Sequence, residues 1–129
     1  MQIKRLILDK LSELNLIKDT SFVILFGSVS KGTANKLSDI DLCISLKLSP
    51  PKRLKVRAKL LGILPENYDV QIFEDLPLYV QKEVLSGEVL YCKNRKELMD
   101  RSLQLIRDYE DFEPVYSLYI SQRKAQVRS

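Results

Sequence analysis

The sequence contains no histidine or tryptophan and only two cysteines among its 129 residues. Cys43 and Cys92 stand alone, with no second cysteine or histidine at the spacing of metal ligands. A zinc site of the cysteine and histidine type and a Cys/His nucleophile pair are therefore excluded within this chain. We expect both cysteines to be buried thiols.

Long apolar segments are also missing. The apolar run Phe22–Phe26 is among the longest, and it is far shorter than the roughly 18 residues that span a bilayer. Near the N-terminus, Lys4, Arg5, Asp9 and Lys10 interrupt the apolar positions, unlike the continuous apolar core of a signal peptide. We therefore expect a soluble, cytoplasmic protein.

The overall composition is that of a globular protein, with 45% hydrophobic residues, 29% charged residues, four glycines and five prolines. A chain of this length fits one domain with a hydrophobic core of its own. No internal repeat or low-complexity segment is present. We expect residues 1–129 to form a single domain in which residues 114–129 are a C-terminal tail.

The spacing of apolar residues predicts strands that alternate with helices. Helices are expected over residues 3–14, 50–61, 77–85 and 94–109, and strands over residues 22–26, 39–44, 68–73 and 89–91. Pro50, Pro51 and Pro77 begin two of the helices, where a missing N–H costs little. The inward-facing positions are expected to be Leu54, Ala58 and Leu61 in the second helix, Val80, Val84 and Leu85 in the third, and Leu98, Ser102, Leu105, Ile106 and Tyr109 in the last.

Acidic residues recur at alternate positions of two predicted strands. Asp39, Asp41 and Cys43 alternate with aliphatic residues, and a period of two places both carboxylates on one face of the strand. On the next strand, Asp69 and Gln71 share one face in the same way. One face of the sheet is therefore expected to be apolar, and the other to carry charge.

A Gly-Ser turn separates the first two strands. Gly27 would let a ligand approach the backbone, and Ser28 offers a hydroxyl, which together suit a phosphate. Carboxylates crowded on the same surface repel each other unless a cation offsets them, and Mg²⁺ commonly bridges carboxylates to phosphates. Taken singly, the Gly-Ser pair reads as an ordinary turn and the two aspartates as a solvated strand or an Asx turn. Their joint occurrence indicates a metal-nucleotide site.

A second feature is a basic stretch without acidic residues between Leu42 and Pro65. It would favour an anionic ligand or partner, but it is equally consistent with the solvated face of a helix. Its basic residues are Lys47, Lys52, Arg53, Lys55, Arg57 and Lys59.

The spacing of these groups resembles a known family. The Gly27-Ser28 pair is followed, after ten residues, by Asp39-x-Asp41, and Asp69 lies on a later strand. This pattern, over about residues 22–74, is similar to that of the minimal nucleotidyltransferases of the DNA polymerase beta-like superfamily. The resemblance implies an α/β (α+β) nucleotidyltransferase fold, with a mixed twisted sheet and helices mainly on one side.

The resemblance also implies a role for each matching residue. Gly27 and Ser28 would hold the β- and γ-phosphates of a nucleoside triphosphate such as ATP. Asp39 and Asp41 would coordinate two Mg²⁺ ions, and Asp69 would complete the site and help to deprotonate the attacking hydroxyl. Many members of this family carry arginine at the position of Lys31. The single ammonium group of lysine here replaces a guanidinium that could donate two parallel hydrogen bonds to a phosphate. Ser38 flanks the first aspartate.

The acceptor of the nucleotide is not evident from the sequence, because barely 55 residues follow the third predicted strand. Small members of this superfamily resemble antitoxins that bind a helical HEPN ribonuclease toxin and adenylylate a tyrosine on it. The alternatives are a transferase for a small molecule such as an aminoglycoside, and a non-catalytic module that neutralises its partner by contact. Direct binding to nucleic acid is possible but not required. The tail could serve such a partner or fold back onto the domain, through Val115, Tyr116, Leu118, Tyr119 and Ile120.

Overall fold

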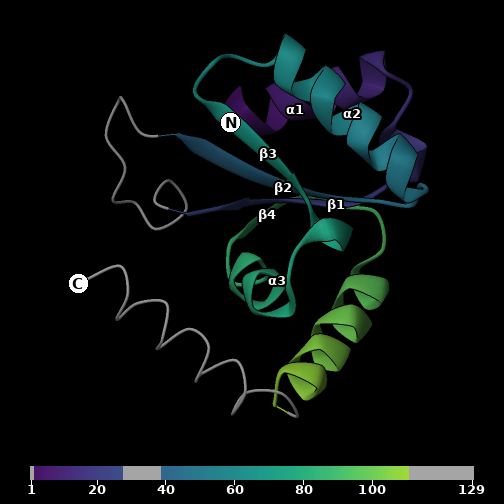
Figure 1. The fold of residues 1–129 in the computed structure, drawn as a ribbon, viewed down its shortest axis with the longest axis vertical. Helices are drawn as coiled ribbons and strands as arrows, with labels where there is room; N and C mark the ends of the chain where they lie inside the picture. The colour runs from purple at the N-terminus through teal and green to yellow at the C-terminus, as the bar shows by residue number, and fades with distance from the viewer. Residues whose placement is uncertain (1, 28–38, 111–129) are drawn as a thin grey trace.

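The computed structural model describes residues 2–27 and 39–110, which form a four-stranded sheet covered by helices on both faces (Figure 1). The elements are α1 (Gln2–Glu13), β1 (Thr20–Phe26), β2 (Ile40–Leu46), α2 (Pro50–Ile63), β3 (Tyr68–Ile72), α3 (Leu78–Val84) and β4 (Glu88–Cys92). The last helix among the described residues, named the final helix, covers residues 95–110, and short 3₁₀ turns occur at Ile17–Asp19 and Phe73–Asp75. The predicted order of strands and helices is confirmed within these residues.

The sheet is mixed, with the strand order β3-β2-β1-β4. β1 pairs antiparallel with both β2 and β4, whereas β2 and β3 are parallel. Because β1 is central and covered on both faces, it is buried at every position from Thr20 to Leu25. This burial on both sides explains its nearly continuous apolar sequence.

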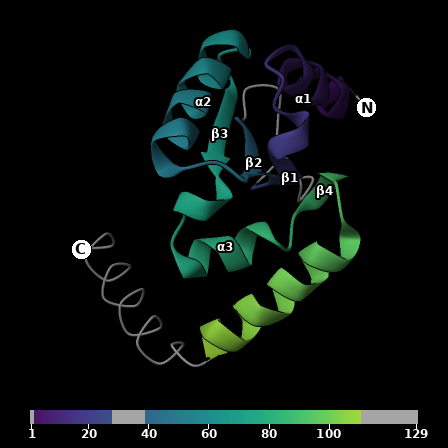
Figure 2. The same ribbon diagram turned by 90° about the vertical axis from the view of Figure 1, so that its right-hand side faces the viewer.

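One face of the sheet is covered by α1 and α2, which lie side by side above it in both views (Figure 2). Ile7 and Leu11 are the buried residues of α1, and Val56 and Leu60 are those of α2. They pack against one side of the strands, formed by Val23, Leu25, Leu42, Ile44, Val70, Ile72 and Leu90.

The opposite face is covered by α3 and the helix of residues 95–110 (Figure 2). Phe22 and Phe73 meet edge to face there, with ring centroids 5.0 Å apart, and Val84 and Leu105 pack on them from the two helices. The predicted mixed sheet and nucleotidyltransferase fold are confirmed. The helices, however, are shared between both faces rather than gathered mainly on one, because β1 and β2 present apolar side chains to each side.

Cys43 shows where the predicted charged face of β2 ends. Its side chain is two positions beyond Asp41 on the same face, and it is fully buried in the core that includes Phe22, Phe73 and Val84. Burial raises the pKa of the Cys43 thiol, with Glu74 adding to the effect, so this cysteine stays protonated at neutral pH. The face is therefore charged only at the start of β2. Cys92 is half-buried against the same core, so only Cys43 is the fully buried thiol that was predicted.

The inward face of α2 differs from the prediction. The helix begins at Pro50 as expected, but Leu54 is 69% exposed and Leu61 is 37% exposed. Val56 and Leu60 face the sheet instead. Adjacent leucines in a helix point about 100° apart, so the sequence alone allowed either stripe, and packing against β3 selects the second.

The final helix begins as predicted, because Asn94 Oδ1 accepts a hydrogen bond from the Glu97 backbone N–H at 3.1 Å. Leu105 is buried, but Ile106 is 43% exposed, so its predicted inward position is wrong. Arg101 takes part in the contact with the sheet, since its guanidinium lies 5.5 Å from the centre of the Phe22 ring in β1 and 5.0 Å from that of Phe73.

A polar cluster of Ser45, Glu74 and Arg101 joins the final helix to β2. Glu74 accepts hydrogen bonds from the Ser45 hydroxyl and from the Leu46 N–H, the latter at 3.1 Å. Arg101 donates to Ser45 Oγ at 2.8 Å and to Glu74 Oε2 at 3.1 Å. Each of these half-buried or buried groups therefore has a partner, as a polar cluster under a helix requires.

Three residues of the basic stretch are paired within the chain. Their ion pairs are Lys47 with Glu97 at 3.0 Å, Arg53 with Asp75 at 2.8 Å and Arg57 with Asp69 at 3.8 Å. Among the residues that the structure describes, no helix is long and apolar enough to cross a membrane. The predicted tail of residues 114–129 lies outside the described residues.

Two leucines of α2 provide a matched test of its orientation. Leu60→Ala should lower the free energy of unfolding by about 2–5 kcal/mol, because it removes a fully buried side chain. Leu54→Ala should change it by no more than about 0.5 kcal/mol, because that side chain is exposed. Urea unfolding of both variants measures the difference, and equal losses would contradict the orientation of α2.

Candidate active site

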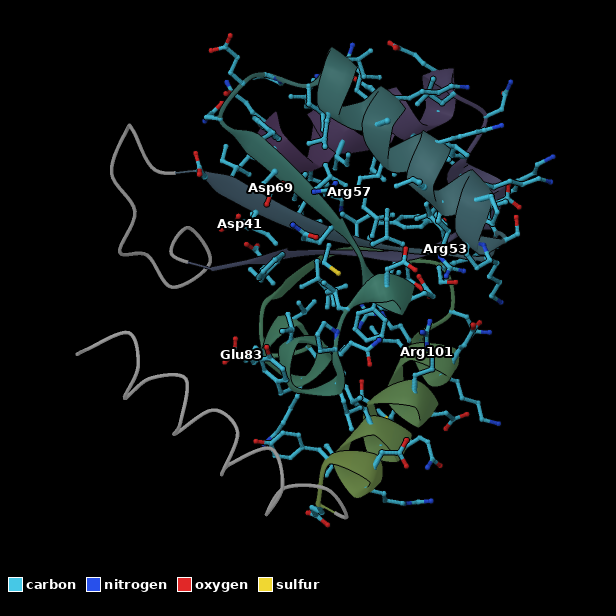
Figure 3. The ribbon with its side chains drawn as sticks, viewed as in Figure 1. Asp41, Arg53, Arg57, Asp69, Glu83 and Arg101 are labelled. Carbon is cyan, nitrogen blue, oxygen red and sulfur yellow. The ribbon has the colours of Figure 1, made fainter. Side chains whose placement is uncertain are left out.

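Two carboxylates lie side by side at one end of the sheet. Asp41, in the second position of β2, pairs with Phe26 on one side and with Asp69 of β3 on the other. Neighbouring strands are about 4.8 Å apart, and paired residues project their side chains to the same face. The structure therefore brings Asp41 and Asp69 together as the alternating pattern predicted (Figure 3).

Asp39 lies one residue before β2 and is exposed. Its charge still reaches Asp41, because it contributes to the shift in the pKa of that residue. Within residues 2–27 and 39–110, no three histidine, cysteine, aspartate or glutamate side chains are already arranged to hold a metal ion. The site described here is thus a pair of adjacent carboxylates with a third nearby.

The pKa of the Asp41 carboxyl is raised above its ordinary value. The main cause is burial, followed by repulsion from Asp69 and then from Asp39. A cation placed between these groups would remove the repulsion. The oxygen-only donors of the site fit a hard divalent cation such as Mg²⁺, which prefers carboxylate ligands.

Asp69 is held by two neighbours. Gln71 Nε2 donates a hydrogen bond to Asp69 Oδ2 at 3.1 Å, and a terminal nitrogen of Arg57 lies 3.8 Å from Asp69 Oδ1. The alternating pattern of β3 places Gln71 on the same face as Asp69 but predicts no role for it, and in the sequence Arg57 is only one member of the basic stretch. No sequence signal pointed to Arg57, because its place depends on how α2 packs against β3.

Gly27, at the end of β1, leaves room for the Asp41 carboxylate. Its φ angle is +80°, and a Cβ built at this position would lie only 2.5 Å from Asp41 Oδ2. A side chain here would be strained by the positive φ, and its Cβ would force the Asp41 carboxylate to move. The predicted turn glycine is thus in contact distance of the predicted metal ligand. Ser28, Lys31 and Ser38 lie outside the described residues.

A strand that ends in a glycine with positive φ, next to two paired carboxylates, agrees with the resemblance to the nucleotidyltransferases. Residues 9–96 match the family model described as polymerase beta, nucleotidyltransferase. The chain belongs to this family. Among curated proteins, it is 32% identical over 94 residues to a candidate protein adenylyltransferase of Methanocaldococcus jannaschii, a match that covers 73% of this chain and 67% of that protein. The chain is thus a nucleotidyltransferase, as predicted.

Solved structures with the same fold come from toxin–antitoxin complexes. A chain of a toxin–antitoxin complex with AMP-PNP superimposes with a TM-score of 0.72 at 21% identity, covering 94% of this chain and 98% of that one. A chain of the complex between the tri-AMPylated Shewanella oneidensis HEPN toxin and its MNT antitoxin gives 0.65 at 19% identity, with the same coverage. At this level of identity, these comparisons establish the fold.

Replacement of Asp41 by asparagine should stabilise the protein at neutral pH, because it removes a partly buried charge and its repulsion from Asp69 and Asp39. A raised pKa means that the folded protein binds the proton more tightly than the unfolded chain, so ionised Asp41 costs stability above that pKa. Screening by solvent limits the gain to about 1 kcal/mol or less. The gain should vanish as the pH falls through the Asp41 pKa, and urea unfolding over pH 3–7 would reveal it. Lower stability of Asp41→Asn at pH 7 would contradict this account.

Two glycines provide a matched pair of alanine substitutions. Gly27→Ala should lower the free energy of unfolding by about 1–2 kcal/mol or more, because its φ is positive and the added Cβ meets Asp41. Gly62→Ala, in α2, should raise it by up to about 1 kcal/mol, because no atom lies within 4 Å of the added Cβ. Thermal denaturation of the two variants measures both signs, and a stable Gly27→Ala protein would contradict the close approach.

Proposed function

We propose that this protein transfers AMP from ATP to a hydroxyl group of a partner protein, in a Mg²⁺-dependent reaction. The observation that carries the proposal is the pairing of Asp41 with Asp69 beside Gly27, at the end of the sheet. The family and the name of the archaeal relative support nucleotide transfer, with a protein as the acceptor.

Asp39, Asp41 and Asp69 are the residues that would hold the metal ions. When bound, Mg²⁺ neutralises charge on the phosphates and lowers the pKa of an oxygen that it contacts. Asp69 would accept the proton of the attacking hydroxyl through Oδ1, because Gln71 already donates a hydrogen bond to Oδ2. In-line attack on the α-phosphate would then release pyrophosphate.

The triphosphate would lie along the turn that follows β1. Gly27 admits it close to the backbone, and we assign Ser28 to its β- and γ-phosphates. Lys31 adds a positive charge, and Ser38 flanks the first metal ligand. These residues orient the triphosphate so that the α-phosphate faces the three carboxylates.

The partner that we propose is a HEPN-type toxin, modified on a tyrosine, so that this protein acts as its antitoxin. The support comes from chains of the same fold that were solved with AMP-PNP and with a tri-AMPylated HEPN toxin. A protein acceptor also agrees with the described fold, because α3 and the final helix pack on the sheet and are not part of a separate acceptor-binding unit. Transfer to a small molecule such as an aminoglycoside has no such support.

The test is to produce the protein together with a HEPN-type protein from the same genome and to weigh both intact. The expected result is an increase in the mass of the HEPN-type protein by one or more AMP units. With Asp41→Asn the increase should disappear, and label from α-labelled ATP should no longer be transferred, with a loss of at least about 10²-fold in rate. Transfer at the normal rate by Asp41→Asn would disprove the role of this carboxylate.

The same pair of proteins separates catalysis from neutralisation by contact. If the antitoxin acts by AMP transfer, Asp41→Asn should bind the partner but fail to restore growth of cells that contain it. A stable complex without added mass, together with normal growth, would instead favour a non-catalytic antitoxin.

A further inference from the structure

Arg57 brings a positive charge to the candidate metal site from outside the predicted motif. It lies in α2, and its guanidinium points across β3 toward Asp69, beside Asp41 (Figure 3). The distance from its terminal nitrogen to Asp69 Oδ1 is 3.8 Å. This is close enough for an ion pair but too long for a hydrogen bond.

A backbone group fixes the guanidinium in this place. Arg57 Nε donates a hydrogen bond of 2.7 Å to the carbonyl oxygen of Val70, the residue that follows Asp69. β3 is an edge strand, and this bond satisfies one of its carbonyls. The charge of Arg57 is therefore held beside Asp69 by a contact that does not involve the carboxylate itself.

Arg53, one turn earlier on α2, forms an ion pair with direct hydrogen bonds, which makes it a useful comparison. Its guanidinium contacts both oxygens of Asp75, with distances of 2.8, 3.2 and 3.3 Å. Asp69 is not gripped in this way, because Arg57 stays 3.8 Å from Oδ1 while Gln71 binds Oδ2. The lone pairs of Oδ1 thus remain open to another ligand, with a positive charge close by.

We propose that Arg57 is a positioning residue that supplies the counter-charge for Asp41 and Asp69 before a divalent cation binds, and that competes electrostatically with that cation. This inference rests on the proposed role of the two carboxylates as metal ligands. Arg57 lowers the repulsion between them in the cation-free protein and repels the incoming cation. Removing its charge should therefore tighten cation binding rather than weaken it.

The test measures binding of Mn²⁺ without nucleotide, by the electron paramagnetic resonance signal of the free ion. Arg57→Gln should bind Mn²⁺ about two- to fivefold more tightly than the unmodified protein, the range expected for loss of one partly exposed charge. The difference should shrink at high salt, because salt screens the repulsion. Arg57→Lys, which keeps the charge, should bind Mn²⁺ like the unmodified protein.

Arg53→Gln is the matched control, because it removes the same charge from the same helix but from a residue paired with Asp75. Its Mn²⁺ affinity should stay within about twofold of the unmodified protein. Equal or weaker binding by Arg57→Gln, together with weakened binding by Asp41→Asn, would overturn this inference and leave the proposed function standing. Mn²⁺ binding that Asp41→Asn does not weaken would overturn the metal role of Asp41, and with it both proposals.

Discussion

The parallel register of β2 and β3 is the constraint on which the candidate site depends. It sets Asp41 opposite Asp69, although their charges repel each other and burial adds to the cost. The opposing force is the packing of the sheet, whose strands are buried on one face by α1 and α2 and on the other by α3 and the final helix. Two cores therefore hold an arrangement that the two carboxylates alone would not adopt.

The sheet carries two polar clusters, Ser45 with Glu74 and Arg101, and Asp41 with Asp69, which differ in how fully their carboxylates are paired. In the cluster of Ser45, Glu74 and Arg101, the carboxylate receives hydrogen bonds on both oxygens and faces a guanidinium within hydrogen-bonding distance. Among the described residues, no guanidinium lies within hydrogen-bonding distance of Asp41 or Asp69, and that of Arg57 stays 3.8 Å from Asp69 Oδ1. Polar groups that serve only the fold are normally satisfied, whereas an unresolved repulsion is typical of a site that awaits a ligand.

Much of the fold and of the site could be predicted because both have local sequence signals. Alternating residues located Asp41 and Asp69 on strands, the prolines located the start of α2, and Asn94 located the start of the final helix. What failed depended on packing between distant elements: the exposure of Leu54 and Ile106, and the only partial burial of Cys92. The contribution of Arg57 could not be predicted for the same reason, since no spacing in the sequence relates α2 to the first residues of β3. The roles of all the site residues remain predictions: Gly27, Ser28, Lys31, Ser38, Asp39, Asp41 and Asp69.

The position of the carboxylates at the start of β2 and β3, rather than in the middle of a face, has a consequence for how such a protein can change over evolution. Helices cover both faces of the sheet, so under the proposed function a substrate would approach along the strands, from the end where β1 stops and β2 begins. Connecting segments would then meet the substrate, whereas the buried residues that hold the fold lie deeper in the sheet. Substitutions in these connecting segments could therefore change the substrate without altering the buried residues that stabilise the fold.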